Sequence, residues 1–218
     1  MVLLQGNKSS SNLNPGGSTQ TLAHTQNTGA DGFIIAFVTM PSSVNHSSAT
    51  YGGESMTQLY NELRSSLSQR MVCYYLASPP TGSNDFVATY SGAQWSSTSI
   101  HISSFTGADS TIGNYGVSVE ATSPHSRNIT VSANSYIYAT GCSVNSQSDP
   151  YTFDGNNMTT AFNGHNSNRI VEGAWYQETT AGTYAVVTKT ASSTITNDRV
   201  EIKEASAAPT GKRRIIIC

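Results

Sequence analysis

The chain has 218 residues and a formal net charge of -2 at pH 7, and 11% of its residues are charged, compared with about 25% in typical globular proteins. Its densest basic cluster is Lys212, Arg213 and Arg214, which gives nucleic-acid binding little basis, and no apolar run approaches the roughly 20 residues of a membrane-spanning helix. Because 9% of the residues are aromatic, we expect a folded protein that binds neither nucleic acid nor a membrane.

Strand signals bounded by turn residues recur along the first half of the chain. Residues 2–5 predict a short opening strand, followed by a turn through Gly17. Residues 19–25 alternate in polarity like a half-buried strand, whereas residues 33–38 are nearly all apolar. The second pattern is typical of a strand that is covered on both faces.

The next segment is ambiguous. Leu59, Leu63 and Leu67 lie four residues apart within residues 56–69, a spacing that fits one or two helical turns, although a loop or a strand pair fits as well. Residues 70–76 and 85–90 predict a hairpin around Pro79 and Gly82, because proline and glycine favour tight turns. Residues 100–105 then alternate like another strand.

The second half of the chain repeats the first. Residues 51–60 return as residues 153–162, with aromatic, glycine and Met-Thr positions in the same order. Residues 71–91 align with residues 170–191, and residues 99–102 with residues 199–202, both at an offset near 100. The strands predicted at residues 19–25 and 33–38 have counterparts at residues 128–131 and 136–140. Such a repeat indicates duplicated supersecondary units.

These patterns predict an all-β fold, an antiparallel two-sheet β-sandwich that is jelly-roll-like and built from two pseudo-repeated halves. We expect each half to supply strands to both sheets. The alternative is two separate small sandwiches joined near Ser123 and Pro124. We expect one domain over residues 1–207, with repeat units at about 19–109 and 127–207, and a tail over residues 208–218.

The tail combines a basic stem with an apolar tip. An exposed apolar strand promotes aggregation unless it pairs with a sheet edge or fills a pocket. The tail therefore either completes the sheet of its own subunit or docks on a neighbouring one. The candidate interface residues are Lys212, Arg213, Arg214, Ile215, Ile216 and Ile217.

The inventory of reactive groups predicts a protein without enzymatic activity. The five histidines are scattered, and Cys73, Cys142 and Cys218 have neither zinc-type nor disulfide-framework spacing. The acidic and amide residues near Asp154 could ligate calcium, but they also read as an ordinary turn. We therefore expect no catalytic residue, no metal and no cofactor. The first residues lack a signal peptide, which favours synthesis and assembly in a cytoplasm.

Aromatic residues offer a possible ligand contact. Tyr75 and Trp175 occupy equivalent positions of the two halves, so we expect them to serve as core contacts. Trp95 has no equivalent in the second half. It is therefore the candidate for a surface contact with a glycan.

Several motifs of the first half, at residues 33–38, 49–57, 72–82 and 105–109, resemble the β-sandwich, jelly-roll-like domains of tailed bacteriophages and of some bacterial surface proteins. The resemblance implies a virion structural protein on the outer head surface, assembled in the bacterial cytoplasm. Its expected role is that of a capsid decoration, or cement, protein that binds the major capsid protein as a homotrimer. The alternative is a tail-fibre or receptor-binding module that contacts host surface glycans.

Overall fold

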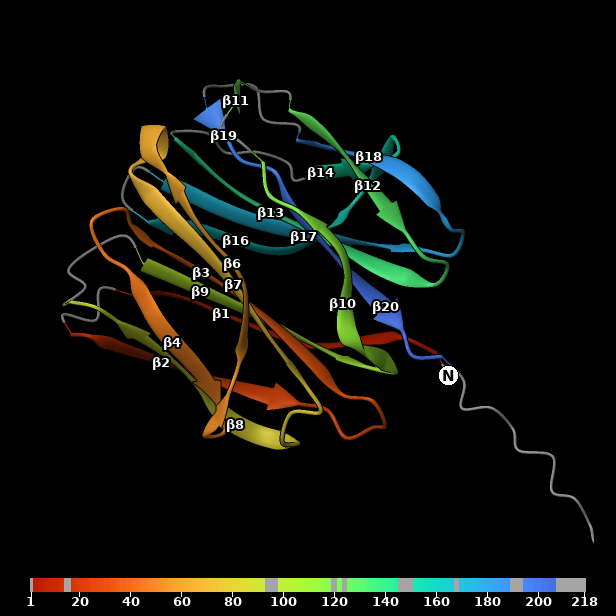
Figure 1. Ribbon diagram of the computed structural model, residues 1–218, viewed down its shortest axis with the longest axis horizontal. Helices are drawn as coiled ribbons and strands as arrows, with labels where there is room; N and C mark the ends of the chain where they lie inside the picture. Colours follow the sequence, from red (N-terminus) through yellow and green to blue (C-terminus); the bar gives the residue numbers. More distant parts are fainter. Residues whose placement is uncertain are drawn as a thin grey trace, which may run out of the picture.

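The computed structural model describes residues 2–13, 17–92, 98–118, 121–122, 125–144, 151–166, 169–188 and 194–206. These residues form four antiparallel sheets (Figure 1). The all-β, antiparallel sandwich class predicted from the sequence is thereby confirmed. No helix in the described ranges is long and apolar enough to cross a membrane.

The first half forms two sheets from its own strands. The first inner sheet has the order β1-β9-β3-β7-β6, and the first outer sheet the order β2-β8-β4-β5. The strands are β1 (Leu4–Leu13), β2 (Thr19–Gln26), β3 (Phe33–Pro41), β4 (His46–Tyr51), β5 (Glu54–Ser55), β6 (Thr57–Arg64), β7 (Gln69–Ala77), β8 (Gly82–Tyr90) and β9 (Thr98–Thr106).

The second half repeats this arrangement. The second inner sheet has the order β10-β20-β13-β17-β16, with β11 and β19 beside it, and the second outer sheet has the order β12-β18-β14-β15. The strands are β10 (Ala108–Gly116), β11 (Ala121–Thr122), β12 (Ser126–Val131), β13 (Ser135–Val144), β14 (Tyr151–Phe153), β15 (Asn156–Asn157), β16 (Thr159–Asn166), β17 (Arg169–Glu178), β18 (Gly182–Thr188), β19 (Thr194–Ile195) and β20 (Asp198–Glu204).

Each half is wound like a jelly roll. The chain reverses at β4–β5, and the strands before the reversal pair with those after it in nested order, β3 with β7, β2 with β8 and β1 with β9. In the second half the nested pairs are β14–β15, β13–β17, β12–β18 and β10–β20. Because the same pairs recur, the sequence repeat is a repeat of topology.

A two-residue turn at each reversal explains the strongest part of the sequence repeat. Gly52 and Gly53 have φ angles of 56° and 85°, and their equivalents Asp154 and Gly155 have φ angles of 46° and 79°. Positive φ at both central residues is the geometry of a type I′ hairpin turn, which favours glycine, asparagine and aspartate. Both copies need this turn, and both therefore have residue types that tolerate a positive φ.

Four layers of sheet enclose three apolar cores (Figure 1). One core lies inside the first sandwich, one inside the second, and one between the two inner sheets. Strand β3 is apolar on both faces because Ile34 and Ala36 enter the first sandwich while Phe33 and Ile35 face the second half. The expectation of two sheets that share strands from both halves was wrong, because each half closes its own sandwich.

The segment that the sequence left open between helical turns, a loop and a strand pair forms the edge strand β6 over residues 57–64, which pairs with β7, followed by a 3-10 turn at Ser65–Leu67. Two local expectations need correction. Strands β7 and β8 are not a hairpin, since they belong to different sheets. Strand β1 extends from Leu4 to Leu13 instead of ending at residue 5.

The offset of the repeat changes along the chain. Tyr75 of β7 pairs with Ile35 of β3, and Trp175 of β17 pairs with Tyr138 of β13. Tyr75 and Trp175 are therefore equivalent residues of the two halves, at the expected offset of 100 (175 minus 75). The next strands pair Ile35 with Ser103 and Tyr138 with Val200, an offset of 97 (200 minus 103). The predicted match of residues 99–102 with residues 199–202 was therefore out of register. The offset differs from the predicted one by an odd number of residues, and in a strand an odd shift moves every side chain to the opposite face of the sheet.

A single glycine connects the two halves. Gly107 lies between β9 and β10 and has a φ of 71°. Its N–H donates to the Ala30 carbonyl (3.0 Å), and its own carbonyl accepts from the Ala205 N–H (2.9 Å). A Cβ at this position would lie 2.3 Å from the Val2 carbonyl oxygen. Both the backbone conformation and the close approach therefore require glycine.

We expect Gly107→Ala to destabilise the protein by more than the roughly 1 to 2 kcal/mol of a left-handed non-glycine residue, because the new methyl group also meets the Val2 carbonyl. The matched control is Gly53→Ala, since Gly53 has a φ of 85° but open space around it. Chemical denaturation measures both free energies of unfolding. Equal losses in the two variants would contradict this account of the junction.

Candidate functional site: the buried junction between the halves

The residues predicted to form an interface or a glycan contact lie outside the described residues. They are Trp95, Lys212, Arg213, Arg214, Ile215, Ile216 and Ile217. The aromatic pair that we expected in the core does pack there. Tyr75 stacks on Phe33 with ring centroids 5.7 Å apart, and Trp175 contacts Tyr136 at 5.2 Å. Both residues line the core between the halves.

Aromatic rings make up much of the contact between the inner sheets. Phe37 of the first half stacks on Tyr138 of the second at 5.2 Å, and Phe105 packs on Tyr136 at 5.5 Å. The buried Tyr138 hydroxyl lies 2.8 Å from the Ser103 hydroxyl. Aromatic pairs add about 0.5 to 1.5 kcal/mol each beyond the area that they bury. The two sandwiches thus share one core.

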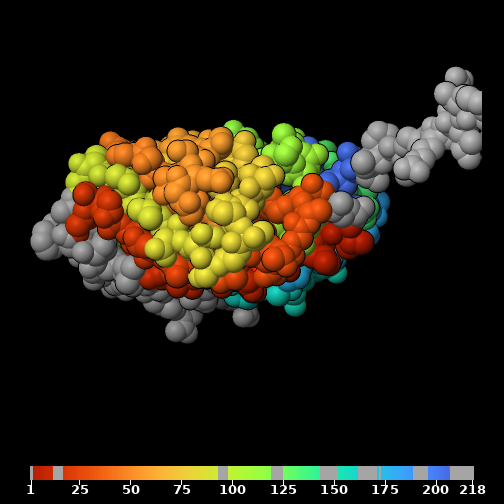
Figure 2. Space-filling view, turned by 90° about the horizontal axis from the view of Figure 1, so that it is seen from below, coloured from red at the N-terminus to blue at the C-terminus, as the bar shows by residue number. Residues whose placement is uncertain are grey.

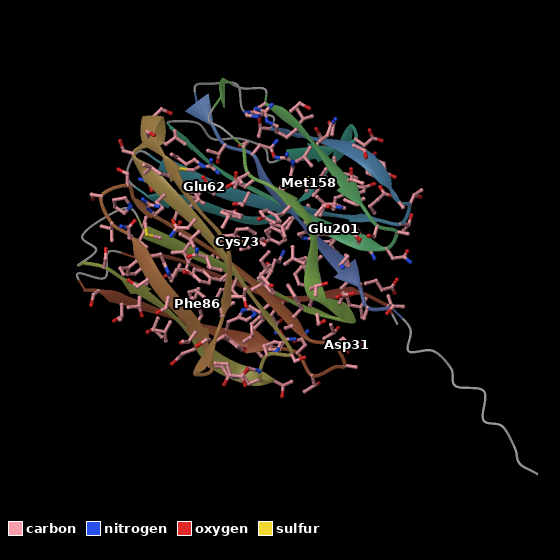
Figure 3. All side chains as sticks on the ribbon, viewed as in Figure 1. Asp31, Glu62, Cys73, Phe86, Met158 and Glu201 are labelled. Atoms are coloured by element: carbon pink, nitrogen blue, oxygen red, sulfur yellow. The ribbon has the colours of Figure 1, made fainter. Side chains whose placement is uncertain are left out.

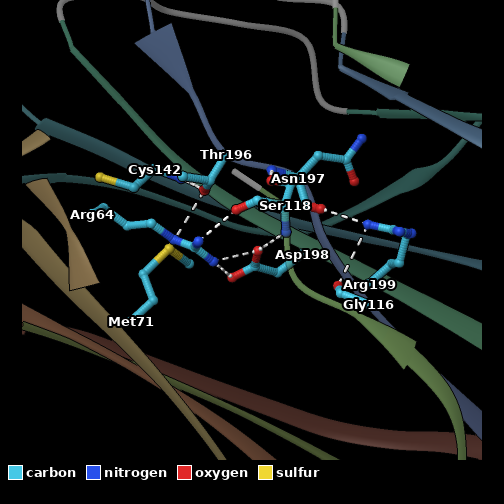
Figure 4. A network of polar contacts seen from close by, with 9 residues as sticks. All are labelled: Arg64, Met71, Gly116, Ser118, Cys142, Thr196, Asn197, Asp198 and Arg199. Carbon is cyan, nitrogen blue, oxygen red and sulfur yellow. Dashed lines mark hydrogen bonds and ion pairs between the residues drawn. The ribbon is translucent and has the colours of Figure 1, made fainter. Parts of the chain in front are cut away.

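A buried ion pair also joins the halves (Figure 4). The Arg64 Nη2 group donates to both carboxylate oxygens of Asp198, at 2.7 and 2.8 Å. Arg64 comes from β6 and is 5% exposed, while Asp198 begins β20 and is 0% exposed. Arg64 also donates to the Ser118 carbonyl, and the Ser118 N–H donates to Asp198 at 3.0 Å. Figure 4 shows these contacts converging at the junction.

The residues before Asp198 extend this network. The Asn197 side chain donates to the carbonyls of Val186 (2.8 Å) and His125 (3.1 Å), and thereby fixes the second outer sheet. The Thr196 hydroxyl accepts from the Cys142 N–H (3.0 Å) and lies 3.5 Å from the Met71 sulfur of the first half. The consecutive residues Thr196, Asn197 and Asp198 therefore contact the second outer sheet and both inner sheets.

The electrostatics of the junction favour a structural role. Burial raises the pKa of Asp198, opposed by the charge of Arg64 and by the Ser118 N–H. Burial and the Asp198 carboxylate raise the pKa values of Tyr60 and Cys73 well above their ordinary values. Cys73 lies in the interior (Figure 3), and a buried neutral thiol is inert. These groups hold the sheets in register and are sealed from any substrate.

A second buried carboxylate fixes strand β10. Glu201 is 0% exposed and accepts hydrogen bonds from the Ser132 N–H (2.5 Å), the Ser135 hydroxyl (2.8 Å) and the Asn114 N–H (2.8 Å). A Cβ at Gly113 would lie 2.1 Å from Glu201. Figure 3 places Glu201 within the second half. Three donors replace the water that burial removes from this carboxylate.

Among the described residues, three histidines are buried in the first half and one, His125, is buried in the second. His46 Nδ1 lies 2.8 Å from the Tyr74 hydroxyl, and His24 Nδ1 lies 3.0 Å from the Ser9 hydroxyl. Burial lowers the pKa of both His24 and His46 to about 4 and the pKa of His101 to about 3. All three are therefore neutral at pH 7.

No group of three or more His, Cys, Asp or Glu residues in the described ranges could hold a metal ion. Asp154, which the sequence marked as a conceivable calcium ligand, occupies the hairpin turn between β14 and β15. Sequence reasoning missed the Arg64–Asp198 pair because its members lie 134 residues apart (198 minus 64). The sequence does contain one signal for such a pair. Few residues of this chain are charged, so a charged residue next to an apolar strand is a candidate for a buried ion pair.

We expect Arg64→Met to lower the free energy of unfolding by about 3 to 5 kcal/mol, because it leaves the Asp198 carboxylate buried without its cation. The double variant Arg64→Met/Asp198→Asn removes both charges and should recover much of that loss. Lys203→Met is the control, since Lys203 and Asp109 are 3.9 Å apart and partly exposed, and exposed pairs contribute less than about 1 kcal/mol. Similar losses for the two single variants in urea denaturation would refute the assignment.

We expect stability to fall as the pH drops from 6.5 towards 4. The pKa values of His24, His46 and His101 lie below their ordinary value of 6.5, so the unfolded chain binds more protons than the folded one in this window. Their contribution is complete above pH 6.5 and is lost on acidification. Urea denaturation at a series of pH values measures the slope, and His46→Gln should reduce it by about one proton. An unchanged slope in His46→Gln would contradict the prediction.

No family model matches this chain, and no curated protein matches it. The resemblance of the first-half motifs to phage virion domains therefore remains a hypothesis about the family.

Proposed function

We propose that this chain is a virion structural protein, a capsid decoration protein that binds the major capsid protein on the outer phage head as a homotrimer. The observation that carries this proposal is that two sandwiches are fused into one body whose outer sheets face away from each other. The buried Arg64–Asp198 pair and the shared aromatic core support a rigid body. Rigidity suits a protein that reinforces contacts between other subunits.

The outer faces of this body are polar and carry little charge. On β2 the outward side chains are Thr19, Thr21, Ala23 and Thr25, while Gln20, His24 and Gln26 point inward. On β12, Ser126, Arg127, Asn128 and Thr130 are exposed. Figure 2 looks onto the first half, where segments from residues 1–100 form a broad continuous face. Such a face supports contact with a large protein surface.

In purified virions, we expect quantitative mass spectrometry to find about one copy of this protein per major capsid protein, or one per capsomer. A capsid-wide decoration role requires this ratio because every equivalent capsid position offers the same binding site. A handful of copies would indicate a tail or vertex position and favour the glycan-binding alternative. Absence of the protein from virions would refute the proposal.

Binding of the purified protein to undecorated capsids tests which outer face makes the contact. The variants Thr21→Glu/Thr25→Glu place two like charges on the first outer sheet, and Asn128→Glu/Thr130→Glu do the same on the second. All four residues are exposed, so neither pair of substitutions disturbs a core. Loss of binding in one pair alone supports a capsid contact through that face, whereas unchanged binding in both argues against the outer sheets as the contact.

A further inference from the structure

The strand pairing makes the two outer sheets comparable residue by residue. Gln26 of β2 pairs with Gly82 of β8, and Val131 of β12 pairs with Gly182 of β18. Counting back along β2 and β12, and forward along β8 and β18, gives every residue of the first outer sheet near this end an equivalent in the second. The offset is 105 for β2 and β12 (131 minus 26) and 100 for β8 and β18 (182 minus 82).

The outward side chains of the two sheets agree closely. Alternate side chains of a strand point to opposite faces, and every outward side chain compared here is exposed or half-buried. The outward equivalents are Thr21 and Ser126, Ala23 and Asn128, Thr25 and Thr130, Ser83 and Thr183, Asp85 and Ala185, and Val87 and Val187. Four of these six pairs keep either a hydroxyl group or a valine in both copies.

The buried side chains of the same strands do not agree. The buried equivalents are His24 and Ile129, Gln26 and Val131, Phe86 and Val186, and Ala88 and Thr188, and no pair keeps its residue. Substitutions on a surface usually change stability by less than about 0.5 kcal/mol, whereas substitutions in a core cost more. Stability alone therefore favours agreement in the core and drift outside, which is the reverse of what the two copies show.

Strand propensity does not account for the agreement either. Thr25 pairs with Ser83 and Thr21 with Val87, and the cross-strand pair between them is Ala23 with Asp85. Alanine and aspartate are both depleted in strands, yet they occupy the middle of this face. In the second sheet the middle pair is Asn128 with Ala185. The faces thus tolerate poor strand formers at one position and share hydroxyl groups and valines at the positions on either side.

We propose that the two outer faces are equivalent binding sites for one kind of partner, so that a single chain binds two copies of the major capsid protein. This inference rests on the proposed function. The first site comprises Thr21, Thr25, Ser83 and Val87, and the second comprises Ser126, Thr130, Thr183 and Val187. Hydroxyl groups both donate and accept hydrogen bonds, so each site suits an uncharged polar surface, with the valine as an apolar contact.

The architecture allows both sites to be occupied at once. Strands β2, β8 and β4 lie at one end of the layered body and β12, β18 and β14 at the other (Figure 1). The shared core and the Arg64–Asp198 pair lie between them, so a partner on one face does not meet a partner on the other. Two linked contacts on an assembled capsid raise the overall affinity above that of either one, by a factor on the order of 10² to 10⁴.

The test measures how many copies of the partner each chain binds. The unassembled major capsid protein is mixed with the full-length chain, and size-exclusion chromatography with light scattering gives the mass of the complex. We expect two bound copies per wild-type chain, one for Thr21→Glu/Thr25→Glu, one for Ser126→Glu/Thr130→Glu and none for the variant with all four substitutions. Each altered site presents two carboxylates that a contact would have to bury without a cation.

The control exchanges the residues at the position where the two faces differ. Ala23→Asn/Asn128→Ala gives each face the residue of the other, and this variant should still bind two copies. A single bound copy per wild-type chain would overturn the equivalence of the sites and leave the proposed function intact, whereas no bound copy would refute the proposed function itself. Loss of both copies in either single-face variant, or a loss in the exchange variant, would also overturn the inference.

Discussion

The burial of the two inner sheets against each other is the constraint on which the rest of the structure depends. Each sandwich has a second apolar face that it cannot cover alone, since Phe33, Ile35 and Phe37 point out of the first sandwich. Covering these faces drives the halves together. The Arg64–Asp198 pair adds direction to this contact because Arg64 Nη2 donates to both Asp198 oxygens while Nη1 donates to the Ser118 carbonyl, which fixes the orientation of the guanidinium group. Its desolvation cost offsets much of its attraction, so its main effect is to fix the register of the halves.

The two copies of the jelly roll have diverged in their cores. At equivalent positions, where β2 and β12 pair with β8 and β18, the first half buries His24 and Gln26 while the second buries Ile129 and Val131. The histidines whose pKa burial lowers to about 3 to 4, His24, His46 and His101, all belong to the first half. Burial lowers the pKa of His125 in the second half as well, so histidine protonation acts on both halves, with the larger shifts in the first.

This distribution of polar groups also bears on function. The titratable groups of the junction are sealed inside the body, and the outer sheets carry threonine, serine and asparagine side chains. A fused body with two outer faces that carry little charge is compatible with the proposed binding to other proteins. The virion role proposed for it depends on that surface chemistry together with the resemblance of the first-half motifs.

The sequence by itself determined the all-β class and the duplication, because these depend on local periodicity and on residues such as Gly53 and Gly155 that recur at equivalent positions; the type I′ geometry of the two turns came from the φ angles of the structure. The sequence also indicated that β3 is covered on both faces. Only the tertiary structure decided that the covering partner of β3 is the other half, that β7 and β8 part into different sheets, and that Arg64 meets Asp198. These contacts join residues far apart in the chain, and their geometry depends on how complete sheets pack, which no local pattern encodes.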